Sequence, residues 1–373
     1  MRFRIERDVF ADAVAWTARS LPARPTAVVL GGMLHEVDGN TLTVSGFDYE
    51  VSAQAEAEVH AGTAGRALVS GRLLTEITKM LPPHPVDVSV EGPRVTIACG
   101  SARFTLPTMP VEDYPSLPAM PRTAGVVDAA QFAAAVQQVA IAAGRDDTLP
   151  MLTGVRLEIE GEQLRLAATD RYRLAVRELL WKPEQSDMSV QVLVPARTIA
   201  ESAKTLAGGS HVTLALSSGG AGEGMIGFAG PGRRTTTRLL DAEFPRYRSL
   251  FPSEWTATAD MSVAPLVEAV KRVALVAERG MPVRLDLAEG GLTLTAGGDD
   301  EGRAEEHLEV AYTGEPLTIG FNPGYLLDGL GAVHASTARL SLTTASKPAV
   351  LTGLDGDGVA DYRYLLMPVR LPG

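Results

Sequence analysis

Three stretches with the same amphipathic pattern decide the fold: SGRLLTEITKML at residues 70–81, PARTIAESAKTL at 195–206 and NPGYLLDGLGAV at 322–333. Each has apolar residues at helical spacing, follows a short apolar segment and precedes a pair of strand-like segments. Their first residues lie 125 and 127 positions apart. Because recurrence at a fixed period marks a repeated structural unit, the chain is predicted to contain three units of similar length.

A first helix recurs in the same register. It is read in DVFADAVAWTARSL (8–21), DAAQFAAAVQQVAIAAG (128–144) and APLVEAVKRVALVAER (264–279), and in each unit strand-like segments with period-2 alternation follow. Each unit is therefore expected to hold two helices and about eight short strands. Such strands bury one face against amphipathic helices, so the predicted class is α+β with antiparallel sheets.

Proline-rich bridges separate the units. They are PVEDYPSLPAMPRTAG (110–125) and EFPRYRSLFPSEWTAT (243–258). Proline has a fixed φ and no N–H donor, which suits an extended linker better than a helix or a central strand. We therefore expect three domains, at residues 1–121, 122–254 and 255–373.

Composition narrows the function. Of the 373 residues, 45% are hydrophobic and 21% charged, as expected for folded domains with buried cores. With 34 Lys and Arg against 45 Asp and Glu, the net charge of −11 disfavours uniform attraction to nucleic acid or to an anionic membrane. Any DNA partner therefore requires segregated positive charge.

A single cysteine, Cys99, excludes a disulfide framework and a multi-thiolate metal site, and it fits a reducing compartment. A cytoplasmic location is therefore expected. The longest stretch of mostly small and apolar residues, 129–144, is too short to cross a bilayer. No membrane partner is therefore expected.

Catalytic motifs were sought without success. No phosphate-binding GxxxxGK[ST] loop and no GxSxG elbow occur. The glycine-rich GGAGEG at 219–224 lies between two strand-like runs and is read as a hairpin loop. The histidines lack metal-ligand spacing and are read as scattered surface residues; they are His35, His60, His84, His211, His307 and His334.

The remaining reactive groups also have a structural interpretation. Cys99, in the strand-like VTIACG, is read as a small core residue. The acidic clusters lack calcium-loop spacing and are read as solvated turns; they are Asp146 with Asp147, Asp299 to Glu301, and Asp355, Asp357 and Asp361. We expect no catalytic residue, metal or cofactor, although an α+β enzyme with an unassisted carboxylate pair is kept as a rival.

Four further motifs are specific in combination. They are AATDRYRLAVRE (167–178), FPRYRSLFP (244–252), FNPGYLLDGL (321–330) and YLLMPVRL (364–371). In this order they closely resemble the bacterial DNA polymerase III beta subunit, the replication sliding clamp, over essentially the full chain. The resemblance implies a non-enzymatic processivity factor: a head-to-tail homodimer of six similar domains forming a ring around double-stranded DNA, with helices facing the hole.

If helices face the hole, their cations are the expected DNA contacts. Arg72 and Lys79 lie seven residues apart, two turns along one helix face, and Arg197 and Lys204 repeat that spacing. The alternative, ordinary solvated helix faces, stays open. The candidate DNA-facing residues are Arg19, Arg24, Arg72, Lys79, Arg197, Lys204, Lys271, Arg272 and Arg279.

The resemblance also implies a cleft that takes short peptide motifs. Its implied partners are the DNA polymerase III alpha subunit, the clamp loader, other polymerases and repair proteins, and cyclic-peptide inhibitors. The residues implied to line it or to lie beside it are Leu152, Thr169, Arg173, Leu174, Pro245, Leu250, Tyr325, Leu365, Met367, Pro368, Val369 and Arg370. Taken separately from the resemblance, Leu152, Leu174 and Leu250 are more typical of a core.

Phe104, Leu106 and Leu275 match family positions at the dimer interface, with interior packing as the alternative. The sequence departs from the family pattern at Arg171 and Tyr172, beside the implied cleft, at Met151, and in the residues after 371. These departures support a second interpretation: a duplicate clamp that gives tolerance to a clamp-binding natural product, with altered affinity for peptides or inhibitors.

Overall fold

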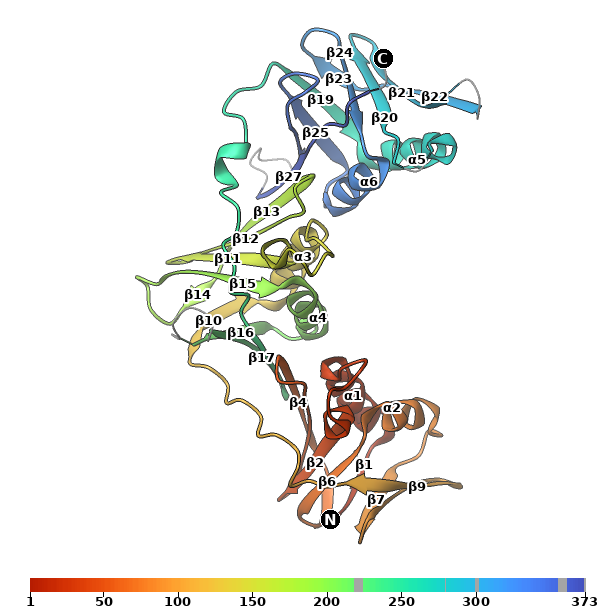
Figure 1. Ribbon diagram of the computed structural model, residues 1–373, viewed down its shortest axis with the longest axis vertical. Helices are drawn as coiled ribbons and strands as arrows, with labels where there is room; N and C mark the ends of the chain where they lie inside the picture. The colour runs from red at the N-terminus through yellow and green to blue at the C-terminus, as the bar shows by residue number, and fades with distance from the viewer. Residues whose placement is uncertain (218–223, 279, 299–301, 355–360, 372–373) are drawn as a thin grey trace. The chain divides into compact units, whose positions relative to one another are not determined.

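The computed structural model describes residues 1–217, 224–278, 280–298, 302–354 and 361–371 (Figure 1). Its contacts divide the chain into two compact units. The first comprises residues 1–130, 182–185 and 201–239, and the second comprises 131–181, 186–200 and 240–373. The secondary structure nevertheless repeats three times along the chain, as the sequence predicts.

The first repeat, described throughout, contains two α-helices, two 3₁₀ turns and nine strands. In chain order they are β1 (Arg2–Ile5), α1 (Arg7–Thr17), η1 (Ala18–Ser20), η2 (Val28–Gly31), β2 (Gly32–Asp38), β3 (Thr41–Phe47), β4 (Val51–Glu58), β5 (His60–Thr63), β6 (Gly65–Ser70), α2 (Gly71–Met80), β7 (Val86–Glu91), β8 (Arg94–Cys99) and β9 (Ala102–Met109).

The described residues of the second repeat have the same succession. Its elements are β10 (Thr123–Asp128), α3 (Ala129–Ala140), η3 (Pro150–Leu152), β11 (Gly154–Glu160), β12 (Gln163–Thr169), β13 (Arg173–Leu180), β14 (Lys182–Pro183), β15 (Ser189–Pro195), α4 (Ala196–Leu206), β16 (His211–Leu216), β17 (Met225–Gly230) and β18 (Arg233–Arg238). A short 3₁₀ turn, η4 (Arg248–Leu250), lies between this repeat and the next.

The described residues of the third repeat follow the pattern again. Its elements are β19 (Ala257–Ser262), α5 (Val263–Val273), η5 (Ala274–Val276), β20 (Val283–Ala288), β21 (Gly291–Gly298), β22 (Gly302–Leu308), β23 (Ala311–Thr313), β24 (Leu317–Phe321), α6 (Pro323–Ala332), β25 (Thr337–Leu342), β26 (Ala349–Gly353) and β27 (Tyr362–Leu366).

The described residues thus form nine strands per repeat where the sequence predicts about eight. The strand that escapes sequence analysis is the fifth of each repeat: β5, β14 or β23, of two to four residues. Each pairs with the first strand of its own repeat, β1, β10 or β19. These strands are too short to show the alternation that identifies the others.

Each sheet lies within one unit. In the first unit the strand order is β14-β10-β16-β17-β18-β4-β3-β2-β6-β9-β8-β7-β1-β5, and neighbouring strands are antiparallel. In the second unit the orders are β15-β11-β12-β13-β27-β26-β25-β19-β23 and β22-β21-β20-β24. The pairs β18–β4 and β13–β27 join strands of neighbouring repeats, which explains why the central repeat is shared between the two units.

The second helix of each repeat starts where the sequence predicts. α2, α4 and α6 begin directly after Ser70, Pro195 and Asn322. The Asn322 side chain accepts a hydrogen bond from the backbone N–H of Tyr325 at 3.1 Å, satisfying a free donor of the first turn of α6. On α2, Leu74 and Ile77 are buried while Arg72 and Lys79 are exposed, so the amphipathic reading is confirmed.

One glycine of α6 is required by packing. A Cβ atom at Gly329 would lie 2.5 Å from Cδ1 of the Tyr364 ring, closer than carbon atoms approach in a packed interior. The ring of Tyr364, which is fully buried, therefore packs directly against the helix backbone. This contact brings α6 close to the C-terminal strand β27.

The segments between repeats cover sheet faces. We call residues 110–122 the first bridge and residues 239–256 the second bridge. In the first unit, Tyr114 of the first bridge packs with Leu34, Phe47 and Leu68. In the second unit, the second bridge adds its aromatic residues to a larger cluster, which comprises Ala167, Leu174, Val176, Leu193, Phe244, Tyr247, Val350 and Leu365.

One sequence interpretation is wrong for His35. Its side chain is 4% exposed rather than on the surface, and burial lowers its pKa to about 4 although its hydrogen bond to the carbonyl of Met33 opposes the shift. The residue has a β-strand position that faces the core, where a neutral imidazole packs edge-on to Phe10. The other five histidines are exposed.

Cys99 is 1% exposed and lies 3.1 Å from the carbonyl of His84, which confirms it as a core residue. β16 and β17 pair as an antiparallel hairpin around the glycine-rich 219–224 segment, most of which lies outside the described residues. The predicted turns at 299–301, 355 and 357 also lie outside them. No helix in the described residues is long and apolar enough to span a bilayer.

Candidate peptide-binding site

A tight turn between β12 and β13 builds one wall of the site. The Asp170 carboxylate accepts hydrogen bonds from the backbone N–H groups of Tyr172 and Arg173, both at 3.1 Å. Thr169 donates its hydroxyl to the carbonyl of Arg173 at 2.7 Å. Arg171, at the tip, has a positive φ of 80°, a conformation that costs a side-chain-bearing residue about 1–2 kcal/mol.

Arg173 is the centre of the polar part of the site. Its guanidinium pairs with Asp170 at 2.9 Å and with Asp328 of α6 at 2.5 Å. It also lies 4.4 Å from the centre of the Tyr325 ring, a favourable cation–π distance. Burial alone lowers the pKa of Arg173, but the Tyr364 hydroxyl and the two carboxylates outweigh it and raise this pKa, so the residue stays charged.

Two tyrosines line the same wall. The rings of Tyr172 and Tyr325 are stacked, with centroids 6.2 Å apart and an angle of 23° between planes. Tyr172 is 60% exposed. The Tyr364 hydroxyl donates to the carbonyl of Tyr325 at 2.9 Å, which holds α6 against β27. An aromatic face is therefore presented to solvent beside a fixed cation.

A cavity of about 730 Å³ opens at these residues. It includes Leu152, Arg173 and Tyr325 of the predicted cleft. Its other lining residues are Ala143, Gly144, Arg145, Asp146, Leu149, Asp170, Arg171, Tyr172, Asn322, Gly324 and Asp328. The size is in the range of ligand-binding pockets.

The remaining predicted cleft residues gather in the same unit. Leu174 and Leu365 are buried together in the apolar cluster under the second bridge, and Thr169 is also buried. Pro245 is half-buried, whereas Leu250 is 46% exposed. In the C-terminal segment Met367 is 38% exposed, Pro368 and Val369 are half-buried, and Arg370 is exposed.

Backbone hydrogen bonds hold that C-terminal segment in place. The N–H of Met367 donates to the carbonyl of Tyr172 at 2.9 Å, and the N–H of Val369 donates to the carbonyl of Gly320 at 2.8 Å. The segment that carries Met367 is thus bonded to the 169–173 turn. The second unit therefore contains a polar and aromatic wall, an apolar cluster and a partly exposed methionine.

Sequence reasoning missed several lining residues. Asp170 lies within the family motif AATDRYRLAVRE and Asp328 within FNPGYLLDGL, but neither was predicted as a cleft residue. The spacing of Tyr325 and Asp328, three residues on one helix face, is the signal that links them. Leu149, Arg145 and Asp146 come from a loop that has no periodic pattern.

The predicted DNA-facing cations are exposed wherever the structure describes them; Arg279 lies outside the described residues. Four of them form ion pairs: Arg19 with Glu201 at 3.7 Å, Arg72 with Glu76 at 3.5 Å, Lys271 with Glu268 at 2.8 Å and Arg272 with Glu306 at 2.5 Å. Among the described residues, no partner pairs with Arg24, Lys79, Arg197 or Lys204. The first two repeats therefore present more free positive charge on these positions than the third.

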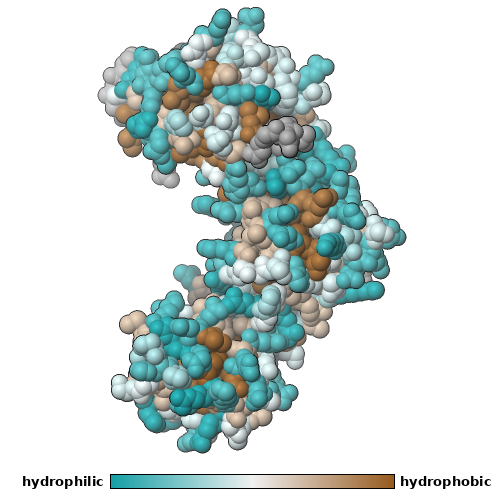
Figure 2. All heavy atoms as spheres, turned by 180° about the vertical axis from the view of Figure 1, so that it is seen from behind, coloured by the Kyte–Doolittle hydropathy of each residue, from teal (hydrophilic) through white to brown (hydrophobic). Residues whose placement is uncertain are grey.

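The predicted interface residues differ in exposure. Leu275 is 83% exposed, Phe104 is half-buried and Leu106 is 6% exposed. Figure 2 shows hydrophobic residues gathered in separate surface patches within the N-terminal, central and C-terminal parts. No cluster of three or more His, Cys, Asp or Glu side chains suited to a metal ion occurs among the described residues.

Comparisons with known proteins cover the whole chain. Models of the DNA polymerase III beta subunit match in three parts: the N-terminal domain over residues 1–118, the central domain over 126–246 and the C-terminal domain over 248–370. The beta sliding clamp of Streptomyces coelicolor is 56% identical over 376 residues, covering 100% of both chains.

A beta sliding clamp homolog, GriR of Streptomyces muensis, is 45% identical and covers 99% of both chains. Among solved structures, the sliding clamp of Pseudomonas aeruginosa bound to griselimycin has a TM-score of 0.92 with 30% identity, covering 100% of both chains. The similarity thus extends over all three repeats.

Proposed function

The chain belongs to the bacterial DNA polymerase III beta subunit family, the beta sliding clamps, and on that premise we propose that it encircles double-stranded DNA as a head-to-tail homodimer and tethers partner proteins through the cleft described above. The observation that carries the tethering part is the cavity of about 730 Å³ in which Leu152, Arg173 and Tyr325 meet. These three residues come from separate segments, and the family resemblance implies that all three line a peptide cleft.

Two free strand edges support the homodimer. β9 pairs with β6 only at Met109 and Thr108, so its residues 102–107 are bonded on one side alone, to β8. β22 ends the four-stranded sheet of the second unit. Phe104 lies on the first edge, and the exposed Leu275 lies in η5, which packs against β22. Since unpaired edges attract further strands, a second copy that joins β9 to β22 satisfies both.

The DNA contact is expected to be weak and independent of base sequence. A helix of about ten residues spans roughly 15 Å, so cations along it reach several phosphates without reading bases. Such contacts weaken as salt rises. The ring retains DNA by enclosure, and weak contacts leave it free to slide.

The cleft is suited to exchange of partners. Burial of two apolar anchors yields about 3–6 kcal/mol, whereas a micromolar complex requires about 8 kcal/mol. A few hydrogen bonds supply the rest, so binding is reversible and partners take turns. We expect short peptides of the polymerase alpha subunit, the clamp loader, other polymerases and repair proteins to bind here, with Met367 adapting to each.

We further infer that the protein acts as a non-catalytic processivity factor in the cytoplasm, where bacterial DNA is replicated. The inference is supported by the cleft, where Arg173 forms ion pairs with both Asp170 and Asp328. The rival enzyme hypothesis requires a carboxylate pair with a chemical role in the cleft.

Loading on a nicked DNA circle tests this function. A matching clamp loader and ATP are used to load the protein, the circle is isolated by gel filtration, and half is then linearised. Retention on the circle with release after linearisation is expected. Equal retention on both forms would contradict enclosure, and light scattering should give twice the 39.4 kDa chain mass.

A second candidate is a duplicate clamp with tolerance to a clamp-binding natural product. It is favoured by the 45% identical homolog GriR and by Arg171 and Tyr172, which border the cavity. Titration of griselimycin and of a fluorescent clamp-binding peptide against this protein and against the Streptomyces coelicolor clamp distinguishes the two. Weaker binding of the inhibitor here supports the second candidate, and equal dissociation constants refute it.

A further inference from the structure

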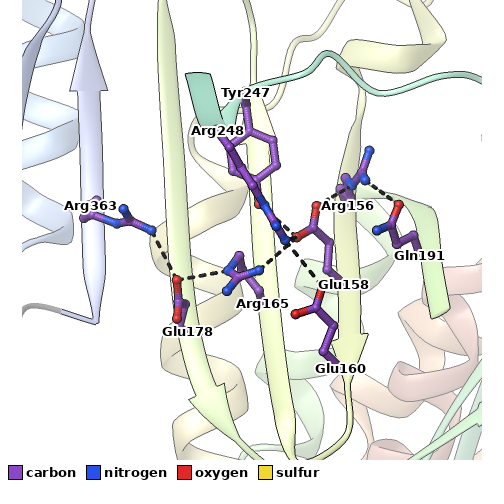
Figure 3. Close-up of polar contacts among 9 residues, drawn as sticks. All are labelled: Arg156, Glu158, Glu160, Arg165, Glu178, Gln191, Tyr247, Arg248 and Arg363. Carbon is purple, nitrogen blue, oxygen red and sulfur yellow. Dashed lines mark hydrogen bonds and ion pairs between the residues drawn. The ribbon is translucent and has the colours of Figure 1, made fainter. Parts of the chain in front are cut away.

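One buried carboxylate joins the second bridge to the sheet beneath it. Glu158 of β11 has a side chain that is only 2% exposed. Two arginines of the sheet form ion pairs with its carboxylate, Arg156 at 2.7 Å and Arg165 at 3.1 Å. From the second bridge, Arg248 forms an ion pair with the same carboxylate at 2.6 Å, and the Tyr247 hydroxyl donates a hydrogen bond to it at 3.1 Å (Figure 3).

The network extends across the sheet from this point. Arg165 of β12 also binds Glu178 of β13 at 3.0 Å, and Glu178 receives Arg363 of β27 at 3.2 Å (Figure 3). Arg248 reaches Glu160 as well, at 3.6 Å. The second bridge is therefore joined, mainly through the Glu158 carboxylate, to a network that spans four strands.

Glu158 is held in its charged form. Burial alone raises the pKa of this carboxyl, but the hydrogen bonds from Arg248 and Arg165 and the charge of Arg156 outweigh burial and lower it. Arg165 and Arg248 each have a second carboxylate partner, but Glu158 is the acceptor that both Arg248 and Tyr247 share. Loss of the Glu158 charge therefore weakens the contacts of Arg248 and Tyr247 with the sheet.

The anchored segment carries cleft residues. Pro245 precedes Tyr247 by two positions, and Leu250 follows Arg248 by two within η4. The Tyr247 ring itself packs in the cluster that holds Leu174 and Leu365. A shift of the second bridge therefore changes the apolar half of the cleft as well as its rim.

The equivalent acids in the other repeats have no such role. GMLHEVD (32–38), GVRLEIE (154–160) and PVRLDLA (282–288) each have an acid at the fifth position. Glu36 is 49% exposed and pairs with Arg66 at 3.7 Å, and Asp286 is 34% exposed and pairs with Arg284 at 2.8 Å. Among the described residues, only Glu158 of the three bonds to a bridge.

We propose that Glu158 is a positioning residue for the peptide cleft: it fixes the second bridge so that Pro245 and Leu250 stand where a bound peptide requires them. The proposal rests on the proposed function, because it assumes that the cleft binds clamp-binding peptides. Glu158 acts through the bridge and does not touch the peptide.

A double-mutant cycle tests it in the full-length dimer. The dissociation constant of a fluorescent clamp-binding peptide is measured for wild type, Glu158→Gln, Leu250→Ala and the double variant. We expect Glu158→Gln to weaken binding about tenfold in the wild-type background and less than about twofold in the Leu250→Ala background. Its shift in melting temperature should be the same in both backgrounds, and Glu36→Gln should leave binding unchanged.

Other outcomes have defined meanings. An equal loss from Glu158→Gln in both backgrounds, wild-type affinity of Glu158→Gln, or wild-type affinity of Leu250→Ala overturns the positioning role while the proposed function stands. Failure of the wild-type protein to bind any clamp-binding peptide contradicts the proposed function itself. If Glu158→Gln does not fold, Tyr247→Phe, which keeps the ring packing, takes its place in the same cycle.

Discussion

The two bridges occupy the same place in successive repeats but are held in different ways. In the first bridge Tyr114 packs against Leu34, Phe47 and Leu68, and no ion pair among the described residues joins this bridge to the sheet. The second bridge adds a buried ion cluster around Glu158 to a similar apolar contact. Only the second bridge carries residues of the proposed cleft. If the cleft binds peptides as proposed, polar contacts that fix one copy of a repeated linker have given that copy a role in binding.

Replacement of the acids at equivalent positions, Glu158 and Glu36, should give the largest difference in the free energy of unfolding. Glu158→Ala is expected to lower the free energy of unfolding of its unit by about 3–5 kcal/mol, because it removes three hydrogen bonds that a buried carboxylate accepts from Arg165, Tyr247 and Arg248. Glu36→Ala, which breaks an exposed pair, should cost less than about 1 kcal/mol. Thermal unfolding of both variants measures this, and equal shifts in melting temperature would remove the distinction between the bridges.

Replacement of the two bridge tyrosines by phenylalanine should give a smaller difference in the free energy of unfolding. Tyr247→Phe deletes a 3.1 Å hydrogen bond to the Glu158 carboxylate and should cost about 1.5–3 kcal/mol, the value for hydrogen bonds to charged groups. Tyr114→Phe should change the free energy of unfolding by less than about 0.5 kcal/mol, since no side chain among the described residues bonds its buried hydroxyl. Urea titration of the two variants side by side gives the comparison.

Acid should weaken the second bridge selectively. The pKa of Glu158 is lowered in the folded protein, so its stabilising effect is present above the ordinary glutamate pKa of about 4.3 and is lost as pH falls through the folded value. The difference in melting temperature between wild type and Glu158→Gln should therefore be full at pH 7 and shrink below about pH 4. A difference that stays constant across this range contradicts the role of the charge.

The smallest effect concerns two turns with the same geometry. Arg171 and Tyr49 both have positive φ, at 80° and 75°, in turns closed by Asp170 and Asp48. Replacement by glycine relieves strain at either position and should stabilise by about 0.5–1 kcal/mol after the entropy of glycine is subtracted. Only Arg171→Gly is expected to alter peptide affinity, because Arg171 borders the cavity.

The three repeats could be predicted from local sequence patterns, whereas the site depends on contacts between residues that are far apart in the sequence. The starts of α2, α4 and α6 follow from the helical periodicity of their apolar residues, which is a property of neighbouring residues. Arg173, however, meets Asp328 and Tyr364 across 155 and 191 residues, and only the family resemblance brought Arg173 into the site.

The burial of Glu158 could not be predicted from the sequence either, because it too depends on a distant segment. In GVRLEIE the alternation predicts Arg156, Glu158 and Glu160 on one face of the strand, and that is where they lie. The same alternation reads this face as solvent-exposed, because polar residues normally face water. A bridge from almost 90 residues further along covers it, and no local pattern reports such coverage. The prediction for His35 was wrong for a different reason: it rested on the lack of metal-ligand spacing, whereas alternation places His35 on the face of β2 that carries the buried Met33 and Val37.

Hydrogen exchange of both bridges, with and without a clamp-binding peptide, tests whether the second bridge alone takes part in peptide binding. Amide exchange of residues 244–251 and 110–117 is measured by mass spectrometry on the full-length dimer, at a peptide concentration well above its dissociation constant. Slower exchange in the second bridge, with no change in the first, is the result that this account predicts. Equal slowing of both bridges, or no change in the second, would contradict it.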